Sequence, residues 1–131
     1  MKSVLNVNDL SKSSNMEISK VSYEDVKSRF ESVKPDLLDT AATYYGAFIK
    51  GELVGVVSYV EQERVIYLCH AFVLSEYRGR GIYKMLWNYR SAKISGTDKT
   101  VYAHCNVDSL KYFINNGYEI EKALFKVVKK S

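Results

Sequence analysis

The stretch YRGRGIYKML, from Tyr77 to Leu86, combines residue types that can hold a phosphate group. Gly79 and Gly81 lie next to arginines, and an amphipathic run follows at once. Glycine lets a backbone approach a ligand closely, and the first N–H groups of a helix have no partner inside the helix. These groups carry the positive end of the helix dipole, so a strand, this turn and a helix predict a cradle for a phosphate or pyrophosphate.

The turn differs from two well-known phosphate-binding signatures. It lacks the Lys-Ser/Thr pair of a nucleoside-triphosphate loop, and it lacks the full glycine set of a dinucleotide-binding turn. Taken alone, the two glycines therefore fit a plain tight turn as well as they fit a cradle.

Positive charge is concentrated in the second half of the chain, around this turn. The net charge is +4, and five basic residues stand against one carboxylate between Glu76 and Lys93. Another five basic residues and two carboxylates lie between Lys111 and Ser131. Such a field attracts an anionic ligand, and a solvated basic surface is the alternative interpretation.

The rest of the pattern predicts the elements that must position the turn. An alternating run predicts a strand over residues 15–21, and a short helix follows from the candidate N-cap Ser22. Three antiparallel strands are predicted over residues 44–49, 53–60 and 65–74. A helix over 82–93, a strand over 100–105, a helix over 106–115 and one or two strands after Tyr118 follow. This order predicts a mixed, three-layer α/β domain.

Length and composition predict one domain over residues 1–131. The chain has ordinary apolar content, which is enough for a sizeable core. No apolar run approaches the ~20 residues of a membrane span, and the N-terminus lacks the apolar region of a signal peptide. Cys69 and Cys105 lie far apart and fit no metal-ligand spacing. We therefore expect reduced thiols, no metal, no membrane contact and a cytoplasmic location.

Two patterns resemble those of the GNAT superfamily, the acyl-CoA-dependent N-acyltransferases. The residues from Arg78 to Tyr83 are similar to the family pattern Gln/Arg-x-x-Gly-x-Gly/Ala. A second family pattern, Asn-x-x-Ala/Ser-x-x-x-Tyr/Phe-x-x-x-Gly-Phe/Tyr, is matched by Asn106, Ser109, Phe113, Gly117 and Tyr118. The resemblance begins near Tyr44 and runs to the C-terminus. It implies a GNAT-like fold: a mixed, mostly antiparallel central sheet flanked by helices in three α/β/α layers.

The resemblance implies binding of acetyl-CoA and transfer of its acetyl group to a primary amine by direct attack. The main chain of Phe72 and Val73 would form hydrogen bonds with the pantetheine arm. The thioester would lie between strands 65–74 and 100–105. The pyrophosphate would be held by the backbone N–H groups of Arg78, Gly79, Arg80, Gly81, Ile82 and Tyr83. Asn106, Ser109 and Tyr112 complete the predicted set of cofactor-binding residues.

Two positions depart from the family pattern. Tyr83 stands where the family has Gly or Ala, so its side chain either crowds the pyrophosphate or points outward. Phe113 stands where many members have the tyrosine that acts as general acid, and phenylalanine has no proton to give. Tyr112 is adjacent, but it is rotated by ~100° around the helix and is no simple replacement. The thiolate then leaves unassisted, another group or water helps, or the protein is a poor catalyst.

The chain has no carboxylate on the strand where some family members place a base. The candidate catalytic residues are His104, Tyr67 and His70. His104 ranks first because it ends the strand next to the expected thioester, and a histidine pKa near 6.5 suits a base at neutral pH. A packed or surface role is the alternative for each histidine. We expect Cys105 to be a buried, inert thiol and not a nucleophile.

The segment that covers the acceptor site in the family is predicted to be short here. About 22 residues separate Val21 from Tyr44, which favours an open cleft and a large or extended amine acceptor. Alternatively, residues 1–7 supply the first strand. The leading hypothesis is an N-acetyltransferase of an unidentified acceptor. The alternatives are an acyl-CoA-dependent modifier of nucleic-acid bases and a non-catalytic GNAT-fold binding protein. The protein is expected to be a monomer or a homodimer.

Overall fold

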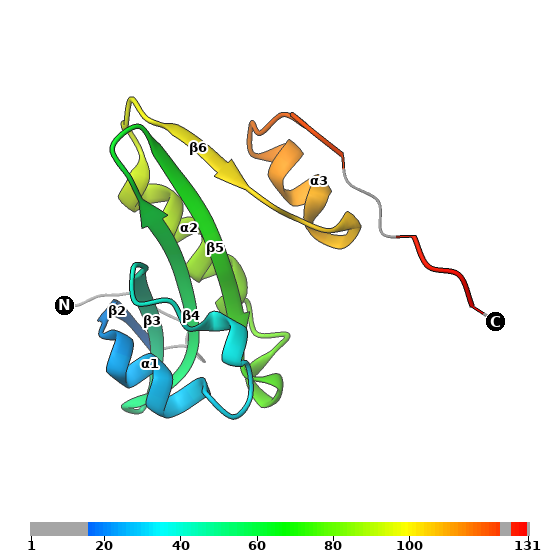
Figure 1. Ribbon diagram of the computed structural model, residues 1–131. Coiled ribbons are helices and arrows are strands. Elements are labelled where there is room, and N and C mark those ends of the chain that lie inside the picture. Colours follow the sequence, from blue (N-terminus) through cyan, green and yellow to red (C-terminus); the bar gives the residue numbers. More distant parts are fainter. Residues whose placement is uncertain (1–15, 124–126, 131) are drawn as a thin grey trace.

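The computed structural model describes residues 16–123 and 127–130, and a mixed sheet lies at its centre (Figure 1). The strands are β2 (Met16–Val21), β3 (Thr43–Ile49), β4 (Glu52–Glu61), β5 (Val65–Val73) and β6 (Thr100–Ala103). They form one sheet in the order β2-β3-β4-β5-β6. The pairs β2–β3, β3–β4 and β4–β5 are antiparallel, and β6 is parallel to β5. The predicted mixed, mostly antiparallel sheet is confirmed.

The helical elements of the described residues are α1 (Tyr23–Phe30), η1 (Pro35–Leu37), η2 (Ser75–Tyr77), α2 (Ile82–Ile94) and α3 (Val107–Asn115). Helices α1, α2 and α3 lie where the sequence predicted them. Helix α1 begins as expected, because the Ser22 side chain accepts a hydrogen bond from the Asp25 N–H at 3.1 Å. Within the described part of the chain, no helix combines the length and apolar character needed to cross a membrane.

Each face of the sheet packs against a different helix. Ile82 and Leu86 of α2 pack against one face, and Val26 and Phe30 of α1 pack against the other. Successive side chains of a strand point to opposite faces of the sheet, so each strand contributes residues to both hydrophobic cores. Together the two helices and the sheet make the predicted α/β/α arrangement.

The connection between β2 and β3 is short and tied to the core. It contains the eight-residue helix α1 and the three-residue turn η1. The Tyr44 hydroxyl donates to the Leu37 carbonyl at 2.6 Å and accepts from the Asp39 N–H at 2.8 Å. The strand predicted over residues 15–21 is present as β2 within the described residues. The alternative first strand, residues 1–7, lies outside the described residues.

Strands β5 and β6 separate after a few paired residues. The parallel ladder joins Val65–Leu68 to Thr100–Ala103, and β5 then continues to Val73 beyond the end of β6. Figure 1 shows β6 turning away from β5 and carrying α3 clear of the sheet. Among the described residues, no strand pairs with this last part of β5 on its outer edge. The main-chain groups of that edge are therefore available to another partner.

A bulge in β5 lies where the two strands separate. Val57 of β4 faces Ala71 and Tyr59 faces Leu68, so Ser58 alone lies opposite two residues of β5. Those two residues are Cys69 and His70. A bulge bends its strand and increases the local twist, which helps to direct β5 away from β6.

Three expectations about the end of the chain are wrong. The predicted C-terminal strand is missing from residues 118–123 and 127–130, because a strand needs a hydrogen-bonded neighbour and this segment runs away from the sheet. Residues 124–126 lie outside the described residues. The strand predicted over 100–105 ends at Ala103. Cys105 is exposed, and not buried, because it lies in the connection to α3.

Candidate functional site

The glycine turn has the conformation and the open space that a cradle needs. Gly79 and Gly81 have φ angles of +80° and +81°, which glycine adopts without strain. A Cβ atom at either position would meet nothing within 4 Å. Gly81 is the N-cap of α2 and offers no side-chain oxygen to the first N–H groups of the helix. These donors are thus left for a ligand on the open side of the turn.

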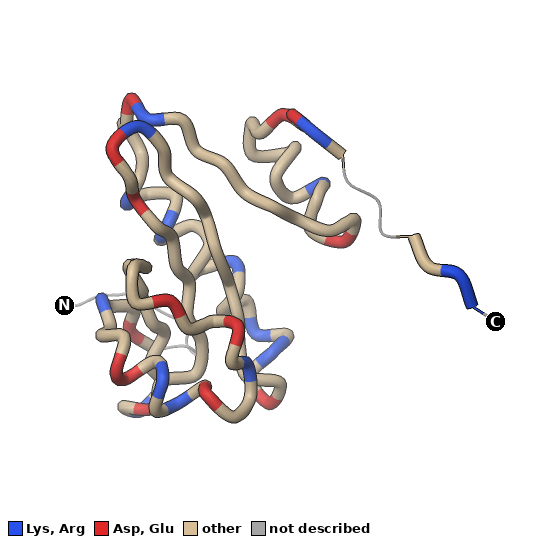
Figure 2. The backbone as a smooth tube through the Cα atoms, in the orientation of Figure 1, with Lys and Arg blue, Asp and Glu red and all other residues tan. Residues whose placement is uncertain are grey.

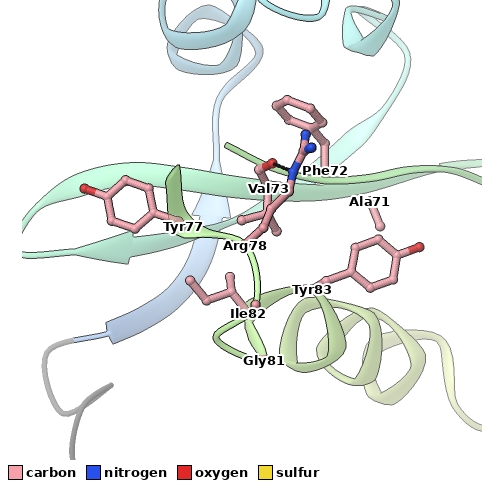
Figure 3. A pocket seen from close by; sticks show the side chains of 9 residues that line it. Ala71, Phe72, Val73, Tyr77, Arg78, Gly81, Ile82 and Tyr83 are labelled. Atoms are coloured by element: carbon pink, nitrogen blue, oxygen red, sulfur yellow. Dashed lines mark hydrogen bonds between the residues drawn. The ribbon is translucent and has the colours of Figure 1, made fainter. Parts of the chain in front are cut away.

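A pocket of about 280 Å³ lies between the end of β5 and this turn (Figure 3). Its lining residues are Ala71, Phe72, Val73, Tyr77, Arg78, Gly79, Gly81, Ile82 and Tyr83. The pocket therefore brings together seven of the predicted cofactor-binding residues, from the end of a strand and the start of a helix. Sequence reasoning missed Ala71 and Tyr77.

Of the two arginines of the turn, Arg78 lines the pocket and Arg80 lies over the lining residue Tyr77. Arg78 Nε donates to the Val73 carbonyl at 2.9 Å, and the guanidinium carbon lies 5.5 Å from the centre of the Phe72 ring. Arg80 lies over the Tyr77 ring at 5.0 Å. Figure 2 shows the basic residues gathered around this turn. The turn therefore presents positive charge beside the open N–H groups.

The free edge of β5 offers its main chain at alternate residues. A Cβ atom at Gly55 would lie 3.0 Å from the Phe72 carbonyl oxygen, so the main-chain groups of Phe72 face β4. The Val73 carbonyl faces the other way, where it accepts from Arg78. Because main-chain groups alternate along a strand, Ala71 also presents its N–H at the free edge. The period of two in this strand was the signal that could have identified Ala71.

A family model described as "Acetyltransferase (GNAT) family" matches residues 7–118. The chain belongs to the GNAT acetyltransferase family. A search of curated protein sequences finds no match.

Solved GNAT structures share the fold. One is a GNAT-family acetyltransferase from Xanthomonas campestris pv. campestris, with 20% identity, coverage of 86% of this chain and 93% of that chain, and a TM-score of 0.67. Another is a ribosomal-protein-alanine N-acetyltransferase from Brucella melitensis, with 18% identity, coverage of 88% and 99%, and a TM-score of 0.64. A third is AAC(6')-Iy with a bisubstrate analogue, with 18% identity, coverage of 88% and 99%, and a TM-score of 0.60.

The second GNAT pattern lies away from the pocket. Asn106 caps α3, where its side-chain oxygen accepts from the Ser109 N–H at 3.0 Å and from the Ser109 hydroxyl at 3.2 Å. Neither residue lines the pocket. Their polar groups satisfy each other at the start of the helix, so the capping of α3 accounts for both residues in this structure.

Helix α3 contacts the rest of the domain through aromatic rings. The Tyr112 ring centre lies 4.8 Å from that of Trp87 and 6.2 Å from that of Tyr83, edge to face. Phe113 packs against Trp87 at 5.6 Å and against Tyr118 at 5.1 Å. Burial raises the pKa of the Tyr112 hydroxyl. Tyr112 thus reaches the pocket through Tyr83, which lines it.

The three candidate catalytic residues lie around the gap between β5 and β6. His70 is half-buried in the bulge, where its backbone N–H donates to Ser58 Oγ at 3.3 Å. His104 is exposed and directly follows the last residue of β6. Tyr67 stacks on Tyr102 of the neighbouring strand, with ring centres 5.7 Å apart. The structure brings these residues to the two strands that separate, but it does not bring them into the pocket.

Arg90 is a buried residue that sequence reasoning counted among the surface charges. It is 3% exposed, and its Nη1 donates to the carbonyls of Ser58 at 3.0 Å and His70 at 3.1 Å. These carbonyls are on both sides of the bulge, so the arginine bridges the distorted ladder. Burial lowers the pKa of the guanidinium to about 10. A helical-wheel count on α2 could have placed Arg90 on the same face as Leu86 and Trp87.

Proposed function

We propose that this GNAT protein is an acetyl-CoA-dependent N-acetyltransferase that acts on a primary amine. The observation that carries the proposal is the open glycine turn at the start of α2, which leaves helix N–H groups and Arg78 at a pocket, with Arg80 nearby over the Tyr77 ring. This arrangement suits the pyrophosphate of coenzyme A. One similar structure, that of AAC(6')-Iy, was solved in complex with coenzyme A.

The donor is proposed to extend from the turn along the free edge of β5. The turn from Arg78 to Tyr83 holds the pyrophosphate, and the N–H of Ala71 is available to the pantetheine arm or the thioester carbonyl. A backbone N–H that points at a developing oxyanion stabilises it, because the donor is already oriented. The thioester then lies near the point where β5 and β6 separate.

The acceptor amine is proposed to enter between the separating strands. The short connection of α1 and η1 leaves this approach less covered than a longer insertion would. The amine nitrogen attacks the thioester carbonyl carbon, the new C–N bond forms, and the C–S bond breaks. His104 is proposed as the base that removes the ammonium proton, because its side chain is exposed and it directly follows the last residue of β6.

Calorimetric titration with acetyl-CoA tests the donor site directly. We expect one site per chain with micromolar affinity, because a helix N-terminus, a basic turn and a strand edge act on one ligand. The titration is preceded by mass spectrometry of the purified protein, since bound coenzyme A that copurifies would mask binding. A protein free of coenzyme A that gives no binding would contradict the proposed function.

Replacing His104 by alanine is expected to lower turnover about a hundredfold at pH 7, because the ammonium loses its base. The deficit should shrink at pH 9, where more of the amine is already neutral. Acetyl-CoA affinity should stay unchanged, since the side chain lies outside the pocket. Rates on a panel of primary amines at both pH values measure this. Equal rates for the variant and the parent at pH 7 would make His104 a surface residue.

A further inference from the structure

Tyr83 is the largest side chain that α2 directs into the pocket. Figure 3 shows its ring beside Ala71, with the hydroxyl pointing away from Gly81 and along β5. The side chain is 42% exposed. The structure shows neither of the two alternatives for this position, because the ring lines the pocket but leaves the glycine turn open. The ring does not cover the open side of the glycine turn, because nothing lies within 4 Å of a Cβ placed on Gly81.

Other side chains of α2 and α3 support the Tyr83 ring. Tyr83, Trp87 and Arg90 are spaced by four and three residues, so they share one face of the helix. Trp87 is 2% exposed, and Tyr112 packs edge-on against both Trp87 and Tyr83. The Arg90 guanidinium lies over the Trp87 ring at 5.7 Å. The Tyr83 ring thus packs against the half-buried Tyr112 ring, which in turn packs against the buried Trp87 ring.

Tyr83 is one of two tyrosines that line the pocket, and its ring is the one that lies beside Ala71. The other ionisable groups near it are Tyr77, Arg78, Tyr112 and Tyr118. The residues that line the pocket include no carboxylate.

We propose that Tyr83 is the proton donor to the departing coenzyme A thiolate. This inference rests on the proposed function. As the C–S bond breaks, sulfur leaves with the bonding electron pair and takes the phenolic proton of Tyr83. The proton that the acceptor ammonium gave up returns to the phenolate through solvent. The step needs no general acid at Phe113, whose ring packs against Trp87 and Tyr118.

A comparison of two ligands tests the contact between Tyr83 and sulfur without any acceptor. Calorimetry at pH 9 gives the affinities of coenzyme A and of desulfo-coenzyme A, which lacks the sulfur atom. A thiol is partly ionised at this pH, and a hydrogen bond to an ion is stronger than one between neutral groups. We expect the parent protein to favour coenzyme A about tenfold and Tyr83→Phe to bind both ligands alike.

Turnover with hydroxylamine as a small acceptor tests the proton transfer. We expect Tyr83→Phe to lower kcat about a hundredfold with little change in the KM for acetyl-CoA. Tyr89→Phe removes a hydroxyl from the same helix outside the pocket, so it serves as the matched control. If Tyr83→Phe has an unchanged kcat, or still prefers coenzyme A to desulfo-coenzyme A, the role of Tyr83 as proton donor is wrong while the proposed function stands. A parent protein that binds neither ligand overturns the proposed function itself.

Discussion

Replacing Gly81 by aspartate is expected to abolish binding of coenzyme A. Gly81 is the N-cap of α2 and has a φ angle of +81°, and a Cβ atom there would project into open space. The carboxylate would occupy the side of the turn where the helix N–H groups are free. It would accept those hydrogen bonds itself and repel the pyrophosphate, so both effects act against the ligand. Calorimetric titration with coenzyme A measures the loss.

Gly96→Asp is the matched control for this variant. Gly96 has a φ angle of +83°, and a Cβ atom there would also meet nothing within 4 Å. It follows the C-terminal end of α2 and lies outside the pocket. Both variants place a side chain in the left-handed region, at a cost of about 1–2 kcal/mol. Binding that is lost in Gly96→Asp as well, or kept in Gly81→Asp, would contradict the cradle.

Local signals in the sequence were sufficient for the elements and for the turn. Ser22 and Asn106 cap their helices through the side-chain bonds that their residue types favour. Gly117 has a φ angle of +90° directly after the α3 C-cap, as a glycine in that position should. Each of these features depends on residues that are neighbours in the chain. A single sequence therefore contains the information that they require.

Features that depend on distant residues could not be predicted in the same way. The bulge at Cys69 and His70 exists only relative to Ser58 of β4, and no local pattern marks it. The prediction of a strand after Tyr118 was wrong for a similar reason. The residue pattern describes the segment itself but does not show whether another strand lies beside it to pair with. The resemblance to the family drew attention to the glycine turn, yet it could not show that the Tyr83 side chain lines the pocket beside that turn.

The bulge connects the buried arginine to the proposed chemistry. Arg90 donates to the His70 carbonyl, which belongs to the same peptide unit as the Ala71 N–H. A charged donor on a carbonyl polarises its peptide and makes the N–H a stronger donor. That N–H lies at the free edge of β5, beside the pocket. Arg90 therefore holds the bent strand and strengthens the group that it presents.

Replacing Arg90 by alanine is expected to lower the free energy of unfolding by about 3 kcal/mol. The Ser58 and His70 carbonyls lose a charged donor, and hydrogen bonds of this kind contribute about 1.5–3 kcal/mol each. A cavity beside Trp87 adds to the loss. The desolvation of the guanidinium opposes both terms, since its Nε has no hydrogen-bond partner in the structure. Urea unfolding at neutral pH measures the difference.

Two further variants separate packing from hydrogen bonding at this position. Arg90→Met restores much of the volume without donors, so it should recover the cavity contribution only. Arg80→Ala removes an exposed arginine and changes the net charge by the same amount as Arg90→Ala. It should change the free energy of unfolding by less than about 0.5 kcal/mol. If Arg90→Met is as stable as the parent, desolvation cancels the two hydrogen bonds, and the arginine is kept for the bent strand edge and not for stability. If Arg90→Met instead loses as much free energy of unfolding as Arg90→Ala, the hydrogen bonds of Arg90 across the bulge are a main support of the fold.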